Sequence, residues 1–159
     1  MSRDITKDIY GDLNYAPITL FGNKLNVGII GAGRGALIKT RNFYNKGSNI
    51  EVLALEFLDD FYELDTNRVK LIKGCYKTQF IKNKHIIIIA VSESELINKI
   101  KLDCENHHKI YINSAKFNEG MGVIPVSRES KYISAAINTK VVPGITQMKN
   151  TVDANVKTY

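Results

Sequence analysis

Gly31, Gly33 and Ala36 stand at the spacing G-x-G-x-x-G/A within the stretch VGIIGAGRGALIKT (27–40). Apolar residues before the motif predict a buried strand, and the residues after it predict a helix. The first glycine allows the tight turn between them, and the second lets a pyrophosphate approach the backbone. The free N–H groups and the positive dipole end of the helix favour phosphate. The residues predicted to hold the pyrophosphate of a dinucleotide are Gly31, Ala32, Gly33, Arg34 and Gly35.

An acidic residue follows the glycine motif at the distance expected for a dinucleotide site. The segment IEVLALEF (50–57) predicts a second strand, and Glu56 stands near its end, about 20 residues after the glycines. A carboxylate there binds the ribose hydroxyls and repels a 2′-phosphate, which favours NAD over NADP, although Arg34 tempers that preference. The residues expected to line the far side of the cofactor, at the end of the fourth predicted strand, are Ala90, Val91 and Ser92.

The elements that must position these residues alternate between strands and helices. Strands are predicted at 27–30, 50–57, 69–74, 85–92 and 109–115, and helices at 35–46 and 93–107. Four consecutive isoleucines in the fourth strand favour a strand covered on both faces. Ser92 or Ser94 is a candidate cap for the second helix. The alternation predicts an α/β fold, a Rossmann-like parallel sheet with right-handed crossovers.

The remainder of the chain has a different character. Residues 121–138 predict two strands around a polar turn at Ser127–Ser130, and Pro143 stands at a plausible helix start. This segment is too short to fold alone, so it must pack on the sheet or on another subunit. We expect an NAD-binding Rossmann domain at 15–116, preceded by a polar lead-in and followed by a β-rich tail at 117–159.

Composition limits the partners of the chain. The formal net charge of +6 favours anionic partners, but the lysines are scattered, so no nucleic-acid partner is expected. No apolar run approaches the about 20 residues of a membrane helix, and the N-terminus lacks the apolar core of a signal peptide. We expect a cytoplasmic protein with no membrane partner. Cys75, Cys104 and the adjacent His107 and His108 form no ligand pattern, so no metal is predicted.

The succession of segments resembles a known family over about residues 15–145. APITLFGNKLNVGIIGAGRGALIKTRNFYNKGSNIEVLALE (16–56), HIIIIAVSESELINKIKLDCENHHKIYINSA (85–115) and GVIP (122–125) are similar to the siroheme synthase dehydrogenase family. This family comprises the precorrin-2 dehydrogenases, some of which are also sirohydrochlorin ferrochelatases. The resemblance implies NAD-dependent oxidation of precorrin-2, a tetrapyrrole with eight carboxylates, to sirohydrochlorin in siroheme biosynthesis. It also implies a homodimer made through the tail.

The substrate side of the chain departs from the family. The family's catalytic aspartate falls on Lys116, and a lysine acts as a base only if its pKa drops by several units. Glu119 is the neighbouring candidate. Asn113 matches the family's asparagine and is the substrate-side candidate, with a turn-forming role as the alternative. The family's helical domain is largely absent after Tyr159. Two functions therefore remain open: a precorrin-2 dehydrogenase-like oxidoreductase, or a non-catalytic NAD- or tetrapyrrole-binding relative.

Overall fold

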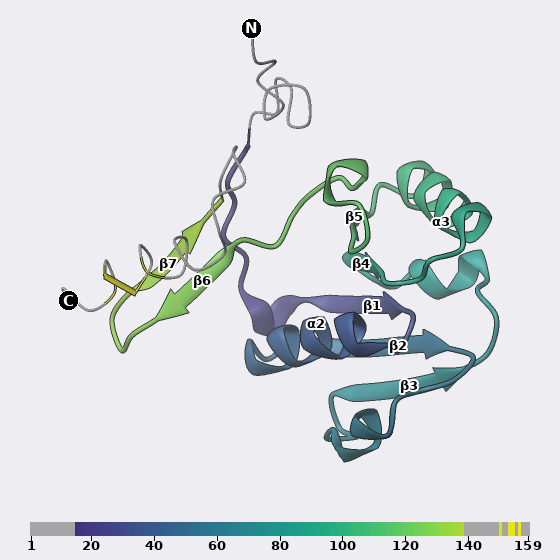
Figure 1. Cartoon of the computed structure of the whole chain (residues 1–159), viewed down its shortest axis with the longest axis horizontal. Coiled ribbons are helices and arrows are strands. Elements are labelled where there is room, and N and C mark those ends of the chain that lie inside the picture. The colour runs from purple at the N-terminus through teal and green to yellow at the C-terminus, as the bar shows by residue number, and fades with distance from the viewer. Residues whose placement is uncertain (1–14, 139–149, 151–152, 155, 157–159) are drawn as a thin grey trace, which may run out of the picture. The chain divides into compact units, whose positions relative to one another are not determined.

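A computed structural model describes residues 15–138, 150, 153, 154 and 156 (Figure 1). The chain divides into two compact units, one of residues 18–123 and the other of residues 1–17 together with 124–159. Each unit is described by itself. Residues 1–14 of the predicted lead-in, and the helix start predicted at Pro143, lie outside the described residues.

The described part of the unit 18–123 is built on a parallel sheet with five strands in the order β3-β2-β1-β4-β5. The strands are β1 (Asn26–Ile30), β2 (Asn49–Ala54), β3 (Val69–Lys73), β4 (Ile86–Ile89) and β5 (Ile110–Asn113). The α-helices are α2 (Arg34–Asn45) and α3 (Ser94–Asn106). Short 3-10 helices lie at Gly22–Lys24, Asp59–Glu63, Thr78–Ile81 and Phe117–Glu119. This arrangement confirms the predicted Rossmann-like α/β fold.

The two faces of the sheet bury separate apolar clusters because successive strand side chains point to opposite sides. Ile29 of β1 packs in the cluster that contains Leu37 of α2, whereas the adjacent Ile30 packs in the cluster that contains Ile100 of α3. The isoleucines Ile86–Ile89 of β4 alternate in the same way, and none is more than 5% exposed. The isoleucine run is therefore covered on both faces, as predicted.

The structure differs from the predicted elements at several places near the carboxyl edge of the sheet. Strand β4 ends at Ile89 and β5 at Asn113, which is three and two residues before their predicted ends. Strand β2 ends at Ala54, three residues earlier than predicted, because its partner β3 ends at Lys73 and the chain then turns toward the glycine motif. The Leu58 N–H donates to the Ala32 carbonyl oxygen at 3.3 Å. The predicted serine caps of α3 are wrong: Glu93 is the N-cap residue, and no side chain caps the helix.

The described part of the second unit contains an antiparallel hairpin of β6 (Val126–Glu129) and β7 (Ser134–Ile137). The two strands are predicted correctly, but the turn lies at Ser130–Ile133 rather than at Ser127–Ser130. The Ser130 backbone explains the shift, since its N–H donates to the Ile133 carbonyl oxygen at 2.8 Å and its Oγ accepts from the Ile133 N–H at 3.2 Å. Serine hydroxyls commonly stabilise turns in this way.

Candidate functional site

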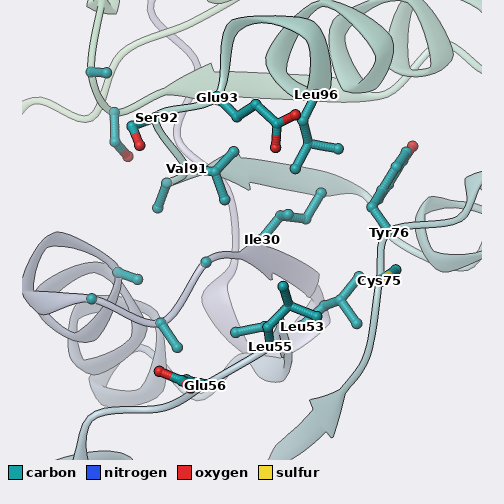
Figure 2. A pocket seen from close by; sticks show the side chains of 18 of the residues that line it. Ile30, Leu53, Leu55, Glu56, Cys75, Tyr76, Val91, Ser92, Glu93 and Leu96 are labelled. Carbon is teal, nitrogen blue, oxygen red and sulfur yellow. The ribbon is translucent and has the colours of Figure 1, made fainter.

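A cavity of about 930 Å³ opens at the carboxyl ends of β1, β2, β4 and β5 (Figure 2). Its floor lies where β1 pairs with β2 on one side and with β4 on the other. From β1 the chain continues through α2 to β2 and then to β3 on one side of β1, whereas β4 lies on the other side of β1 and is followed by α3 and β5. The direction in which strands are added to the sheet therefore reverses between β1 and β4. Open α/β sheets bind their ligands in the crevice outside the strand ends at such a switch point.

Gly31 makes the turn between β1 and α2 in a backbone conformation that other residues rarely adopt. Its φ is 109°, and a Cβ there would come within 2.8 Å of the carbonyl carbon of Ala90. The Gly31 N–H donates to the Leu53 carbonyl oxygen at 2.8 Å, which ties the turn to the end of β2. A glycine is therefore required at this position for the turn itself.

Gly33 and Gly35 leave space rather than fill it. A Cβ added at either residue would meet no atom of the described chain within 4 Å, and both residues line the cavity. Gly33 is the N-cap of α2 and provides no side-chain cap, so the first N–H groups of the helix remain available to a ligand. This open cradle at a helix N-terminus fits a pyrophosphate group.

Eight of the nine residues predicted to bind the cofactor line this one cavity. They are Gly31, Ala32, Gly33, Gly35, Glu56, Ala90, Val91 and Ser92. The ninth, Arg34, is the first residue of α2 but does not line the cavity. Glu56 stands two residues beyond the end of β2, and its side chain lies at the β2 side of the cavity (Figure 2).

The substrate-side candidates lie outside this cavity. Asn113 ends β5 and is 1% exposed. Its Oδ1 accepts from the N–H groups of Ala115 at 3.0 Å and Lys116 at 3.1 Å, which is the turn-forming role given as the alternative. Its Nδ2 has no hydrogen-bond partner in the described part of the chain. Lys116 is 68% exposed in its side chain and pairs with Glu119, at 3.2 Å between Nζ and Oε1.

The cavity wall after β3 was not anticipated from the sequence. Cys75 and Tyr76 follow β3 and line the cavity. The Tyr76 hydroxyl donates to Asp103 Oδ2 at 2.8 Å, and the Thr78 hydroxyl donates to the same oxygen at 2.9 Å, so α3 holds this wall in place. Burial, and then the hydrogen bond to Asp103, raises the pKa of the Tyr76 hydroxyl above its ordinary value. The rule that ligands lie outside strand ends would have pointed to these residues.

The ionisable side chains that line the cavity are mainly acidic. Glu56, Glu93 and Glu95 contribute three carboxylates, and Lys99 contributes one ammonium group. The charge of the described cavity lining is therefore opposite in sign to the net charge of the chain, which alone pointed to an anionic ligand. Glu93 and Glu95 could have been predicted as cavity residues from the sequence, because they follow the fourth predicted strand and ligands bind outside strand ends.

The remaining reactive residues separate into buried and exposed ones. Cys104 is fully buried, and burial raises its pKa to about 12, which suits a core residue. His107 and His108 lie exposed at the end of α3. No group of three or more histidine, cysteine, aspartate or glutamate side chains within the described residues is placed to hold a metal ion. Among the same residues, no helix has the length and apolar character needed to cross a membrane.

Comparison with known proteins gives consistent results for the unit 18–123. A family model described as "Putative NAD(P)-binding" matches residues 19–126. The chain is 31% identical over 103 residues to a siroheme synthase of Pseudoalteromonas translucida (strain TAC 125), which covers 64% of this chain but 21% of that protein. The chain therefore spans about a fifth of the length of this curated relative.

A solved structure extends the comparison to the fold. The precorrin-2 dehydrogenase SirC superposes with a TM-score of 0.71 over 91% of this chain and 71% of that chain, at 18% sequence identity. At this identity the likeness concerns the fold. The family match covers more than half of the chain. The relative found by sequence is a siroheme synthase, in agreement with the resemblance seen in the sequence. The chain therefore belongs to the family described as "Putative NAD(P)-binding".

Proposed function

We propose that the chain oxidises precorrin-2 to sirohydrochlorin with NAD as the oxidant. The observation that carries this proposal is the glycine cradle at the switch point of the sheet, which is open at Gly33 and closed to any side chain at Gly31. The relatives supply the substrate class, since one is named a siroheme synthase and another a precorrin-2 dehydrogenase.

Different residues of the cavity bind different parts of the dinucleotide. The N–H groups at the start of α2 hold the pyrophosphate, and Glu56 accepts hydrogen bonds from ribose hydroxyls. Bound NAD supplies the acceptor for a hydride from the substrate. Ile30 at the end of β1, with Val91 and Leu96 after β4, gives the cavity an apolar wall (Figure 2).

A second function is favoured by a specific observation at the end of β5. Where the family carries an aspartate, this chain carries Lys116, whose ammonium group is exposed and already paired with Glu119. Glu119 also lies 3.7 Å from the Lys101 Nζ. Two ammonium groups therefore engage the Glu119 carboxylate, which does not line the cavity. The alternative is therefore a relative that binds NAD or a tetrapyrrole without turnover.

The assembly belongs to the same proposal. We infer a domain for NAD binding at 15–116 and a tail at 117–159 through which two copies form a homodimer in the cytoplasm. The β6–β7 hairpin supports this inference, since an isolated two-stranded hairpin is marginally stable at best in water. Sedimentation of the full chain at several concentrations tests it, because a dimer dissociates on dilution.

Titration of the full chain with NAD⁺ and NADP⁺ by calorimetry, followed by addition of precorrin-2 and detection of NADH, tests the function. Binding followed by NADH formation supports the dehydrogenase. Binding without NADH formation supports the non-catalytic relative. Absence of NAD⁺ and NADP⁺ binding contradicts the dehydrogenase and leaves only a relative that binds a tetrapyrrole. The control variant is Gly33→Val, which places a branched side chain in the open cradle, where an added Cβ meets no atom of the described chain within 4 Å. It abolishes NAD⁺ binding and leaves the circular dichroism spectrum unchanged.

A further inference from the structure

We propose that Glu93 makes the site selective for the oxidised cofactor, because its carboxylate stabilises the cationic nicotinamide ring of NAD⁺. The neutral ring of NADH gains nothing from this charge. The proposal rests on the NAD site described above, and adds to it a residue that sets which redox form the chain binds. None of the residues predicted from the sequence has this role.

The position of Glu93 leaves its carboxylate free for a ligand. The residue lies between β4 and α3 as the N-cap of the helix, yet its side chain makes no cap hydrogen bond. No ion pair or hydrogen bond of this carboxylate is found within the described residues. Figure 2 shows the side chain reaching over the cavity, beside Leu96 and on the same side as Val91. The fold therefore places a carboxylate at the cavity that forms no hydrogen bond or ion pair with other described residues.

The glycine motif and Glu56 determine which half of the dinucleotide meets Glu93. The cradle at Gly33 fixes the pyrophosphate between β1 and α2, and Glu56 marks the β2 side as the place of one ribose. A dinucleotide crosses the crevice at the switch point, so its other half extends toward β4. Glu93 lines the cavity on that side.

The charge around Glu93 strengthens its effect on the ring. Glu93 is exposed, and the neighbouring Val91 and Leu96 are half-buried side chains of the same part of the cavity. A ligand that covers these two apolar side chains removes water from beside the carboxylate, whose charge is then screened less than at an open surface. Lys99 is the one ammonium group among the described residues that line the cavity, and its Nζ lies 5.7 Å from the centre of the Tyr76 ring with no ion pair to Glu93. No ammonium group among the described residues that line the cavity therefore pairs with the Glu93 carboxylate.

The test compares the dissociation constants of NAD⁺ and NADH for the full chain and for Glu93→Gln. Glutamine keeps the size of the side chain and removes its charge, and α3 loses no side-chain hydrogen bond, because Glu93 makes none to the helix. The wild-type chain binds NAD⁺ more tightly than NADH. Glu93→Gln reduces this preference by about fivefold, which corresponds to about 1 kcal/mol.

Two matched variants separate this role from a general effect of charge. Glu56→Gln, on the β2 side, weakens both forms equally and leaves their ratio unchanged, because the adenosine half does not change charge on reduction. Glu95→Gln removes the neighbouring carboxylate of the same wall and changes the ratio less than Glu93→Gln does. An effect of Glu95→Gln that equals or exceeds that of Glu93→Gln overturns the assignment.

The remaining outcomes distinguish this proposal from the proposed function. If the wild-type chain binds both forms and Glu93→Gln leaves their ratio within twofold of wild type, the role of Glu93 is wrong and the NAD site stands. If the wild-type chain binds neither form, the proposed function fails and this proposal fails with it. Both results come from binding alone, so neither depends on turnover of precorrin-2.

Discussion

Replacing Gly31 by alanine separates the structural demand of the glycine turn from its role in binding. The residue has a φ of 109°, and a Cβ would lie within 2.8 Å of the Ala90 carbonyl carbon and 3.2 Å of Val91 Cγ1. The positive φ costs about 1–2 kcal/mol for a residue with a Cβ. The overlap with backbone atoms adds about 1–3 kcal/mol, because the Ala90 carbonyl cannot rotate away as a side chain would.

We therefore expect Gly31→Ala to lower the free energy of unfolding by about 2–5 kcal/mol, a large part of the stability of a typical domain. Urea denaturation followed by circular dichroism measures this, since a lower midpoint at unchanged slope reports a loss of stability. Two backbone hydrogen bonds lie beside the added methyl group: the Gly31 N–H donates to the Leu53 carbonyl oxygen, and the Ala90 N–H donates to the Ile30 carbonyl oxygen. We expect the substitution to weaken both bonds and so to destabilise the ends of β2 and β4.

Gly33→Ala is the matched control two residues away. Its φ is −85° and the added methyl group meets no atom of the described chain, so its unfolding free energy stays within about 0.5 kcal/mol of wild type. It nevertheless weakens NAD⁺ binding, because the methyl group takes the space of the pyrophosphate. The reasoning is refuted if Gly31→Ala is as stable as Gly33→Ala, since the two differ only in backbone conformation and neighbours.

Three further changes test other parts of the site. Lys116→Asp restores the carboxylate of the family, and it raises the rate of NADH formation at least tenfold over wild type if the chain lacks only the catalytic acid or base. The control Glu119→Lys breaks the same ion pair without adding a carboxylate, and it gives no increase in NADH formation. Glu56→Gln narrows the preference for NAD⁺ over NADP⁺ in calorimetry, because the 2′-phosphate is no longer repelled; an unchanged preference contradicts the ribose role. Burial, and then the hydrogen bond to Glu105, raises the pKa of Tyr111 to about 12. Between pH about 10 and 12 the native state therefore keeps a proton that the unfolded state loses, so the free energy of unfolding falls as the pH rises through this range. Tyr111→Phe makes this fall shallower in urea titrations at several pH values, because Cys104 and Tyr76, whose pKa values are also raised, still contribute to it. An equally steep fall in the variant refutes the contribution of Tyr111.

Local patterns in the sequence determined the elements and the cofactor half of the site. The apolar run of β1, the glycine motif and the helical spacing after it act within a few residues, so they predict a strand, a turn and α2 without knowledge of the rest of the chain. Gly47 ends the helix with a φ of 86°, as a glycine after a helix commonly does. The carboxylate at Glu56 follows from spacing along the same βαβ unit.

The tertiary structure alone decided which side chains meet at the cavity. Glu93 and Tyr76 lie in segments that follow different strands. The parallel pairing brings those strand ends to one edge, and the order β3-β2-β1-β4-β5 decides which of them are neighbours. Lys116 and Glu119 are near Asn113 in sequence, yet a turn directs them to an ion pair outside the cavity. Spacing along the chain fixes local conformation, but it does not fix the direction of a side chain after a turn. That direction depends on contacts between segments far apart in sequence, which form only when the sheet assembles.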